Sequence, residues 1–220
     1  MRVKQFHSGS SGNLYVVEAQ SGGRLLIECG VRWAKLQEAL DYDLSSIAGC
    51  LISHSHRDHC CSAPDLAKSG IDVYASPETL ESVGLADHRR ANLVMDKTLI
   101  TRINGFQVLC FATSHDCEGS LGFVIREIET NEYLLFVTDS SHITQKFNIA
   151  FSIIMLECSY DKDILQERVD TGDINESLAK RLLTSHMEWR NTLRYLLDFC
   201  DLSHCREVHL LHLSGDNLDK

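Results

Sequence analysis

A short stretch after an apolar run most constrains what this chain can fold into. Residues 51–60 read LISHSHRDHC and place four polar side chains within six positions, at His54, His56, Asp58 and His59. Each is costly to bury alone, because an apolar interior offers no partner for its polar atoms. If the extended geometry of the preceding run persists, His54 and His56 point to one side, while the two later residues follow a turn. Such a cluster indicates metal ligands, and it suits two metal ions better than one.

The length and composition predict one globular domain. The chain has 220 residues, of which 44% are hydrophobic and 24% are charged, as in ordinary globular proteins. Its longest apolar stretch, residues 149–158, is too short to span a bilayer, and the first ten residues lack the apolar core of a signal peptide. We therefore expect a single domain over residues 1–220, located in the cytoplasm and not bound to a membrane.

The cysteines are expected to be reduced and mostly buried. There are nine, an odd number in a chain that is not small, which does not suit a disulfide framework. Several of them fall in or next to apolar runs, namely Cys29, Cys50, Cys110 and Cys158. Cys60 and Cys61 follow the histidine cluster, but adjacent side chains usually point apart and the chain has no CxxC pair. We therefore rank these two well below the histidines as metal ligands.

The net charge limits the kinds of partner. At −10 it argues against a broad basic face that holds duplex nucleic acid, because non-specific affinity comes mainly from Lys and Arg neutralising phosphates. It does not exclude a substrate that carries a phosphate, because bound metal ions can supply positive charge locally.

Short apolar segments alternate with helical patterns along the chain. Segments rich in Val, Ile, Leu and Phe predict strands at 13–18, 24–29, 50–53, 71–75, 106–112, 121–127, 133–138, 153–157 and 207–212. Helical spacing and caps predict helices at 32–41, 76–84, 174–183 and 188–200. The strands come in hairpin-like runs with helices between and around them. This order favours a mixed α/β (α+β) fold in which two sheets pack together with helices outside.

The pattern HxHxDH resembles the signature of the metallo-β-lactamase fold, and the resemblance continues down the chain. That family has a further histidine after a strand, an acidic residue at a strand end and a histidine after the last strand. This chain offers His115, Asp139 and His212 in that order, each in a strand–loop context. The resemblance implies an αββα sandwich.

Three further segments resemble the YycJ/WalJ-like branch of this family. They are HSGSSGNLYVVE near the start, SHMEWRNTLRYLL around His186, and LLHLSGDN near the end. Members of that branch are described as DNA exonucleases, and related branches include tRNA-processing nucleases and cyclic-nucleotide phosphodiesterases. The resemblance therefore implies a metal-dependent phosphodiester hydrolase with a nucleic acid or nucleotide as its substrate.

The resemblance also implies the ligand set. His54, His56 and His115 would hold one ion, Asp58, His59 and His212 would hold the other, and Asp139 would bridge them. Imidazole and carboxylate ligands suit zinc first and manganese second. Asp58 and His186 are the catalytic candidates, with His186 expected to contact a phosphate or to protonate the leaving oxygen. A surface or capping role for His186 stays open.

The chain departs from the family pattern at two positions. Glu28 stands where the family usually has an aspartate that orients the ligand histidines, so the longer side chain could reshape the site. The segment TSHMEW, around His186, lacks the glycine and the Ser-Asn pair of the branch. We treat His142 as a weaker candidate, and His7, His88, His204 and His209 as structural or exposed. The SGSSGN loop either presents backbone N–H groups near the site or is an ordinary turn between strands.

Several functions remain open at this stage. The branch motifs favour a DNA exonuclease, with a basic rim formed by Arg89, Arg90, Lys180, Arg181, Arg190 and Arg194 as one way to bind a polyanion. The acidic charge favours the alternative, a small-molecule phosphodiesterase such as the cyclic-nucleotide phosphodiesterases of phage anti-defence type. A binding protein with an inactive site is disfavoured because every ligand position is filled. Thiol-ester and β-lactam hydrolysis are compatible with the fold alone. The oligomeric state is not determined, and a homodimer is one option.

Overall fold

The computed structural model describes residues 1–218, apart from the side chain of Arg102. The chain forms two compact units, the first made of Met1–Ala112 and Cys117–Glu132. The second holds Thr113–Asp116 and the chain from Tyr133 onward. Among the described residues, no helix is both long and apolar enough to cross a bilayer.

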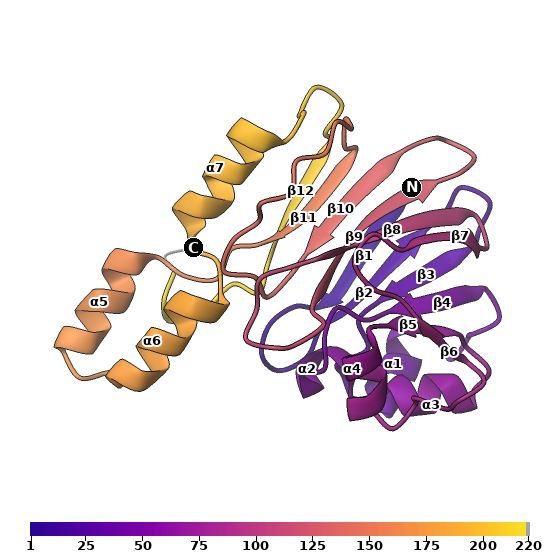
Figure 1. Ribbon diagram of the computed structural model, residues 1–220, viewed down its shortest axis with the longest axis horizontal. Helices are drawn as coiled ribbons and strands as arrows, with labels where there is room; N and C mark the ends of the chain where they lie inside the picture. Colours follow the sequence, from indigo (N-terminus) through magenta and orange to yellow (C-terminus); the bar gives the residue numbers. More distant parts are fainter. Residues whose placement is uncertain (219–220) are drawn as a thin grey trace. The chain divides into compact units, whose positions relative to one another are not determined.

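The first unit is built on a mixed sheet with the strand order β1-β2-β3-β4-β5-β6 (Figure 1). Strands β1, β2 and β3 are antiparallel, and β3 to β6 are parallel. The bounds are Arg2–His7 for β1, Leu14–Glu18 for β2, Arg24–Ile27 for β3, Ile47–Leu51 for β4, Val73–Ala75 for β5 and Ala91–Leu93 for β6. The parallel arrangement brings the carboxyl ends of β3 and β4 to the same edge, where the HSHRDH motif begins.

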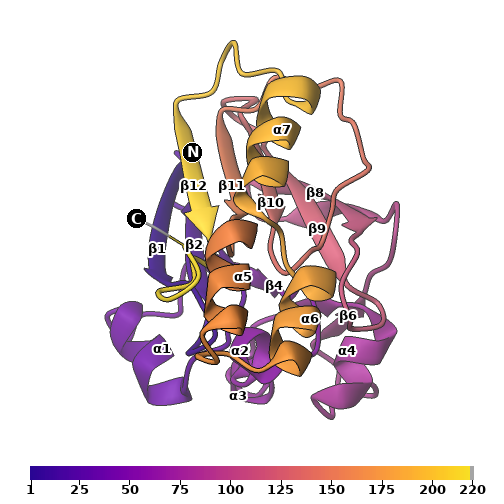
Figure 2. The ribbon, with the colours of Figure 1, turned by 90° about the vertical axis from the view of Figure 1, so that its left-hand side faces the viewer.

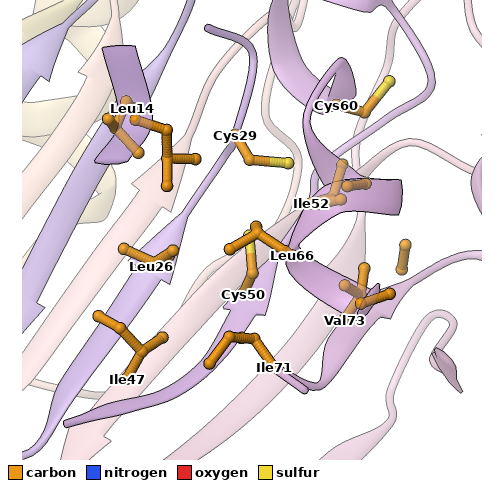
Figure 3. Packing of buried hydrophobic residues seen from close by; sticks show 14 of the residues in the cluster. Leu14, Leu26, Cys29, Ile47, Cys50, Ile52, Cys60, Leu66, Ile71 and Val73 are labelled. Carbon is orange, nitrogen blue, oxygen red and sulfur yellow. The ribbon is translucent and has the colours of Figure 1, made fainter. Parts of the chain in front are cut away.

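Helices cover one face of this sheet. They are α1 (Trp33–Ala39), α2 (Arg57–Cys60), α3 (Ala63–Lys68) and α4 (Pro77–Ser82). Leu66 of α3 packs with Leu26 of β3, Cys50 of β4 and other buried residues in one apolar cluster (Figure 3). Leu36 of α1 belongs to the same cluster. Burial at about 25 cal/mol per Å² of apolar surface makes this cluster a main source of stability in the unit.

Three antiparallel strands, which belong to the second six-stranded sheet of the chain, complete the first unit. They are β7 (Leu99–Ile103), β8 (Phe106–Ala112) and β9 (Leu121–Glu127). The residues of β2 are buried on alternating sides of the strand. Leu14 and Val16 belong to the helix-side cluster, and Tyr15 and Val17 are also buried. Because strand side chains alternate between faces, both faces of β2 are buried.

The second unit pairs three parallel strands of the second six-stranded sheet with helices. The strands are β10 (Tyr133–Val137), β11 (Ile153–Glu157) and β12 (Glu207–Leu211), with β11 in the middle. The helices are α5 (Lys162–Asp170), α6 (Glu176–Ser185) and α7 (Trp189–Phe199). The Thr192 hydroxyl of α7 donates to the Glu157 carbonyl of β11 at 2.7 Å. Helices α5 and α6 lie side by side in Figure 1 and Figure 2 and share a small apolar cluster that includes Leu165 and Ala179.

The mixed α/β architecture with separate sheets and outer helices confirms the expected fold class. The strand expected at 50–53 is instead Ile47–Leu51, because Ile52 and Ser53 leave the ladder toward the motif. The structure adds elements that the sequence patterns did not indicate, namely β1, β6, β7, α2, α3 and α5.

Candidate metal centre

In the first unit, the HSHRDH motif leaves β4 and enters α2 through a short loop. His54 lies three residues past the end of the strand, and His56 caps α2 with an extended backbone. His54 Nε2 and His56 Nδ1 lie 3.1 Å apart, while His54 Nδ1 lies 2.8 Å from the Ser53 hydroxyl. Two nitrogens bound tetrahedrally to one zinc ion at 2.0–2.1 Å are separated by roughly 3.3 Å. The spacing of this pair therefore fits a shared metal ion.

The last two residues of the motif form a second pair. Asp58 and His59 belong to α2, and the Asp58 Oδ2 atom lies 3.5 Å from His59 Nε2. The His59 ring is fully buried and its centroid is 4.1 Å from that of His54. This separation of oxygen and nitrogen also matches two ligands of one ion, because metal–oxygen and metal–nitrogen distances are both close to 2.1 Å.

Glu28 lies behind this pair, at the end of β3. Its carboxylate is fully buried and accepts from the Ser53 N–H at 3.3 and 3.4 Å. Its Oε1 atom lies 3.6 Å from His59 Nδ1, beyond the usual hydrogen-bond range. The residue that departs from the family pattern therefore faces a motif histidine at long range.

In the second unit, Asp139 lies between two histidines. Its Oδ2 atom is 3.9 Å from His115 Nε2 and 3.8 Å from His212 Nε2. These distances are too long for hydrogen bonds, but each is short enough to be spanned by one metal ion with two bonds of about 2.1 Å. His115 Nδ1 donates to the Ser185 carbonyl at 3.0 Å, so the neutral ring carries its lone pair on Nε2, which lies 3.1 Å from Asp116 Oδ1. Burial lowers the pKa of His115 and so favours this neutral form.

His186 forms a hydrogen-bonded pair with Glu157, a residue that the sequence analysis missed. His186 Nδ1 lies 2.6 Å from Glu157 Oε1, and the Ser140 N–H donates to the other carboxylate oxygen at 2.5 Å. Burial alone would lower the pKa of His186, but the bond to Glu157 and the charges of Glu157, Asp139 and Asp116 together outweigh it and raise the pKa of the imidazole. Burial also raises the pKa of Glu157. One sequence feature could have pointed to Glu157: an apolar run is followed by Glu-Cys at Glu28 and again at Glu157.

The His186 ring lies close to the Asp139 group. It stacks on the His212 ring with a centroid distance of 5.0 Å. One polar atom from each of Asp139, Glu157, His186 and His212 lies within 4.8 Å of the others, a grouping able to hold a metal ion. His186 therefore both belongs to this grouping and carries the short bond to Glu157.

Three of these residues have a left-handed backbone. Glu28, Asp139 and His212 have φ angles of 64°, 43° and 54°. A non-glycine residue in this region costs about 1–2 kcal/mol, and such strain concentrates at functional sites. Glu28 and His212 follow directly after β3 and β12, and Asp139 lies two residues past the end of β10, so the left-handed turns redirect the chain as it leaves these strands.

Half of the expected basic rim is occupied by the protein's own carboxylates. Arg90 pairs with Asp72 at 3.1 Å, and Arg181 pairs with Asp116 at 3.1 Å. Arg190 pairs with Glu188 at 2.7 Å and Asp163 at 2.8 Å. These three arginines are therefore less available to a polyanion than the sequence suggested, because each carries a bound counter-charge.

The thiols after the motif bond to carbonyl oxygens. Cys60 Sγ lies 3.1 Å from the His56 carbonyl, and burial raises its pKa to about 12. Cys61 Sγ lies 3.0 Å from the Val31 carbonyl. Both thiols are thus protonated donors. No disulfide joins the nine cysteines, all of which fall within residues 1–218.

Known proteins resemble the chain over most of its length. It is 24% identical to exodeoxyribonuclease YycJ of Bacillus anthracis over 226 residues, which cover 96% of this chain and 81% of that protein. A shorter match, 43% over 56 residues, relates 26% of this chain to 20% of the anti-Pycsar protein Apyc1 of Bacillus phage 010DV004.

The fold is also found among solved structures. Zn²⁺-bound PqqB of Methylobacterium extorquens superposes with a TM-score of 0.73 at 14% identity, over 99% of this chain and 90% of that chain. The sequence profile of the beta-lactamase superfamily domain matches residues 23–201. That profile covers most of the chain, and the motif histidines lie at metal-ligand spacings. The chain therefore belongs to the family of beta-lactamase superfamily domains and has the metallo-β-lactamase fold.

Proposed function

We propose that the protein is a dinuclear metal-dependent phosphodiester hydrolase that acts as a DNA exonuclease. The hydrolase class rests on the family and on the ligand-like spacing of the His54–His56 and Asp139 groups. The choice of DNA is supported by one observation, the similarity to exodeoxyribonuclease YycJ over 96% of the chain.

Two divalent ions, zinc first and manganese second, are proposed for the ligand set of His54, His56, His115, Asp58, His59, His212 and Asp139. Bound there, they would supply a nucleophilic water at neutral pH and neutralise charge on the phosphoryl oxygens. Asp58 contributes a carboxylate that lowers the net positive charge of its site. Elemental analysis of protein purified without chelator should return two equivalents of metal per chain. A metal content well below one equivalent, even after zinc or manganese is supplied, would count against the site.

His186 is proposed as the residue that protonates the leaving oxygen. Glu157 holds the imidazole through Nδ1, which leaves Nε2 as the atom that meets the substrate. The Ser140 N–H fixes the carboxylate in turn. Each of these partners restricts the orientation of the ring, so the proton is held in one direction.

Binding of DNA is tested through two arginines of the same helix. Arg194 is exposed on α7 and Arg190 is already paired with carboxylates. If DNA phosphates contact this helix, Arg194→Gln should raise KM for DNA and reduce its salt dependence, while Arg190→Gln should change both less. If neither variant changes KM for DNA and KM does not depend on salt, a nuclease that binds DNA through this surface is excluded.

A small-molecule phosphodiesterase is the second candidate function. The net charge of −10 and the pairing of Arg90, Arg181 and Arg190 with carboxylates favour a small substrate over a long polyanion. The local 43% identity to the phage anti-Pycsar protein points the same way. Purified protein should be assayed against linear single- and double-stranded DNA, RNA and cyclic nucleotides with zinc, manganese and magnesium. Efficient cyclic-nucleotide hydrolysis without DNA degradation would replace the first proposal by the second.

A further inference from the structure

The SGSSGN loop, residues 8–13, ends against the peptide that carries the second pair of motif residues. The Asn13 N–H donates to the Asp58 carbonyl at 2.8 Å, and the Gly30 N–H donates to the Asn13 carbonyl at 2.9 Å. A Cβ atom on Gly30 would lie 1.6 Å from the Asp58 carbonyl oxygen. Three separate segments of the chain are therefore packed backbone to backbone, and Asn13 cannot move without Asp58.

The orientation of the Asn13 side-chain amide is determined by its partners. Its Oδ1 atom accepts from the Gly9 N–H at 2.9 Å and from the Tyr15 hydroxyl at 3.1 Å. Its Nδ2 atom donates to the carbonyls of Gly9 at 3.2 Å and Asp58 at 3.1 Å. A backbone N–H only donates and a carbonyl only accepts, so the flipped amide would lose these bonds. The NH₂ end of this buried amide consequently faces in one known direction.

That NH₂ end also faces His59. Asn13 Nδ2 and His59 Nε2 lie 3.1 Å apart, and both side chains are fully buried. A proton on Nε2 would meet the Asn13 NH₂ group at 3.1 Å, which is unfavourable, whereas the nearest carboxylate oxygen, Asp58 Oδ2, lies farther away at 3.5 Å. The neutral tautomer that avoids this clash has its proton on Nδ1, the nitrogen that faces Glu28.

We propose that Asn13 is a positioning residue that selects the Nδ1–H tautomer of His59 and thereby directs the Nε2 lone pair to a metal ion. This inference rests on the metal site proposed above, but not on the choice of substrate. Both amide hydrogens of Asn13 already have carbonyl acceptors, so the side chain keeps its bonds when Nε2 turns to a metal. The SGSSGN loop is then part of the ligand support, rather than an ordinary turn between two strands.

The test uses a variant of the same size that reverses the polarity at Nδ2. Asn13→Asp keeps the acceptor toward Gly9 and Tyr15 but places a second acceptor oxygen beside His59 Nε2, which favours a proton there. Nitrogen-15 spectra of metal-free, histidine-labelled protein should show His59 protonated at Nδ1 in the wild type and at Nε2 in the variant. Metal titration of the variant should show one equivalent with unchanged affinity and the second weakened by at least about tenfold, the scale of losing an outer partner.

The matched control is Asn191→Asp, which makes the same change of charge on an exposed position of α7. It should retain the wild-type tautomer and both metal affinities. A wild-type His59 protonated at Nε2 would overturn the inference without any variant, so a misfolded Asn13→Asp protein does not prevent the test. Two wild-type affinities in a folded Asn13→Asp protein would overturn it as well. Protein that binds two ions but degrades no DNA would contradict only the proposed substrate.

Discussion

The chain has the sequence Glu-Cys at the ends of both β3 and β11, and the two glutamates make different contacts. Glu28 follows β3 directly and Glu157 is the last residue of β11. Each is fully buried and accepts from a backbone N–H beyond a neighbouring parallel strand. Around Glu28 the contacts measure 3.3 to 3.6 Å. Around Glu157 the corresponding contacts measure 2.5 and 2.6 Å.

The two glutamates differ in how closely they contact a histidine. The short bond to Glu157, together with the charges of Glu157, Asp139 and Asp116, raises the pKa of His186 against the opposing effect of burial. The long contact with Glu28 lies at Nδ1 of His59 and leaves Nε2 as the atom that we propose for the metal ion. On these proposals, the same arrangement of strand, glutamate and histidine serves a metal ligand in the first unit and a proton donor in the second.

The largest expected effect comes from removing the two histidines in turn. His59→Ala should abolish hydrolysis and lose one equivalent of metal, because a metal ligand is gone. His186→Ala should reduce turnover by about 10²–10⁴-fold, the usual contribution of a general acid, and retain both ions. Metal content and single-turnover rates measure the contrast. Loss of an ion in His186→Ala with full occupancy in His59→Ala would reverse the assignment.

A smaller effect is expected from shortening the two glutamates. Glu157→Asp should reduce turnover by about 10–100-fold, because it breaks bonds of 2.5 and 2.6 Å that orient His186. Glu28→Asp should change the rate by less than about threefold, since contacts of 3.3 Å and more contribute little. Steady-state kinetics with saturating metal compare the pair. A stronger loss for Glu28→Asp would show that its long contacts tighten when metal binds.

The smallest effect concerns the cysteines that follow each glutamate. Cys29 lies in the apolar cluster of the first unit, so Cys29→Ser buries a hydroxyl and should lower the free energy of unfolding by about 1–3 kcal/mol. Cys158 lies near the Thr192 hydroxyl, which lowers its thiol pKa against a larger rise from burial, so Cys158→Ser should cost less than about 1 kcal/mol. Urea denaturation curves of the metal-free variants test this. Equal losses would mean that the two strand ends have equivalent surroundings.

Most of the fold was predictable because its core strands are apolar and regular. The strand expected at 153–157 matches β11, whose side chains are buried throughout. Strand β1 was missed because Arg2–His7 is largely exposed and lacks the apolar pattern of a core strand. Helix α5 was missed for a related reason, since Leu165 is its one fully buried residue and its start depends on the Asp161 cap.

The site was predictable where ligands are close in sequence. His54, His56, Asp58 and His59 come from six consecutive positions, so their type and spacing already specify a metal site. Glu157 was not predictable in the same way, because its partner His186 lies 29 positions further along the chain. The pairing of Arg190 with Asp163 was equally hidden, and only the packing of α7 near the start of α5 reveals it.

The left-handed backbone at Asp139 and His212 has a consequence for the evolution of this chain. Glycine or asparagine would relax either turn and remove part of a strain of about 1–2 kcal/mol per residue. A library of variants selected for folding alone should therefore accumulate these residues at the two positions, while a library selected for hydrolysis should retain aspartate and histidine. At these two positions the residues that favour stability differ from those that favour activity. Comparing the two selections would show whether stability or activity determined the residues found here.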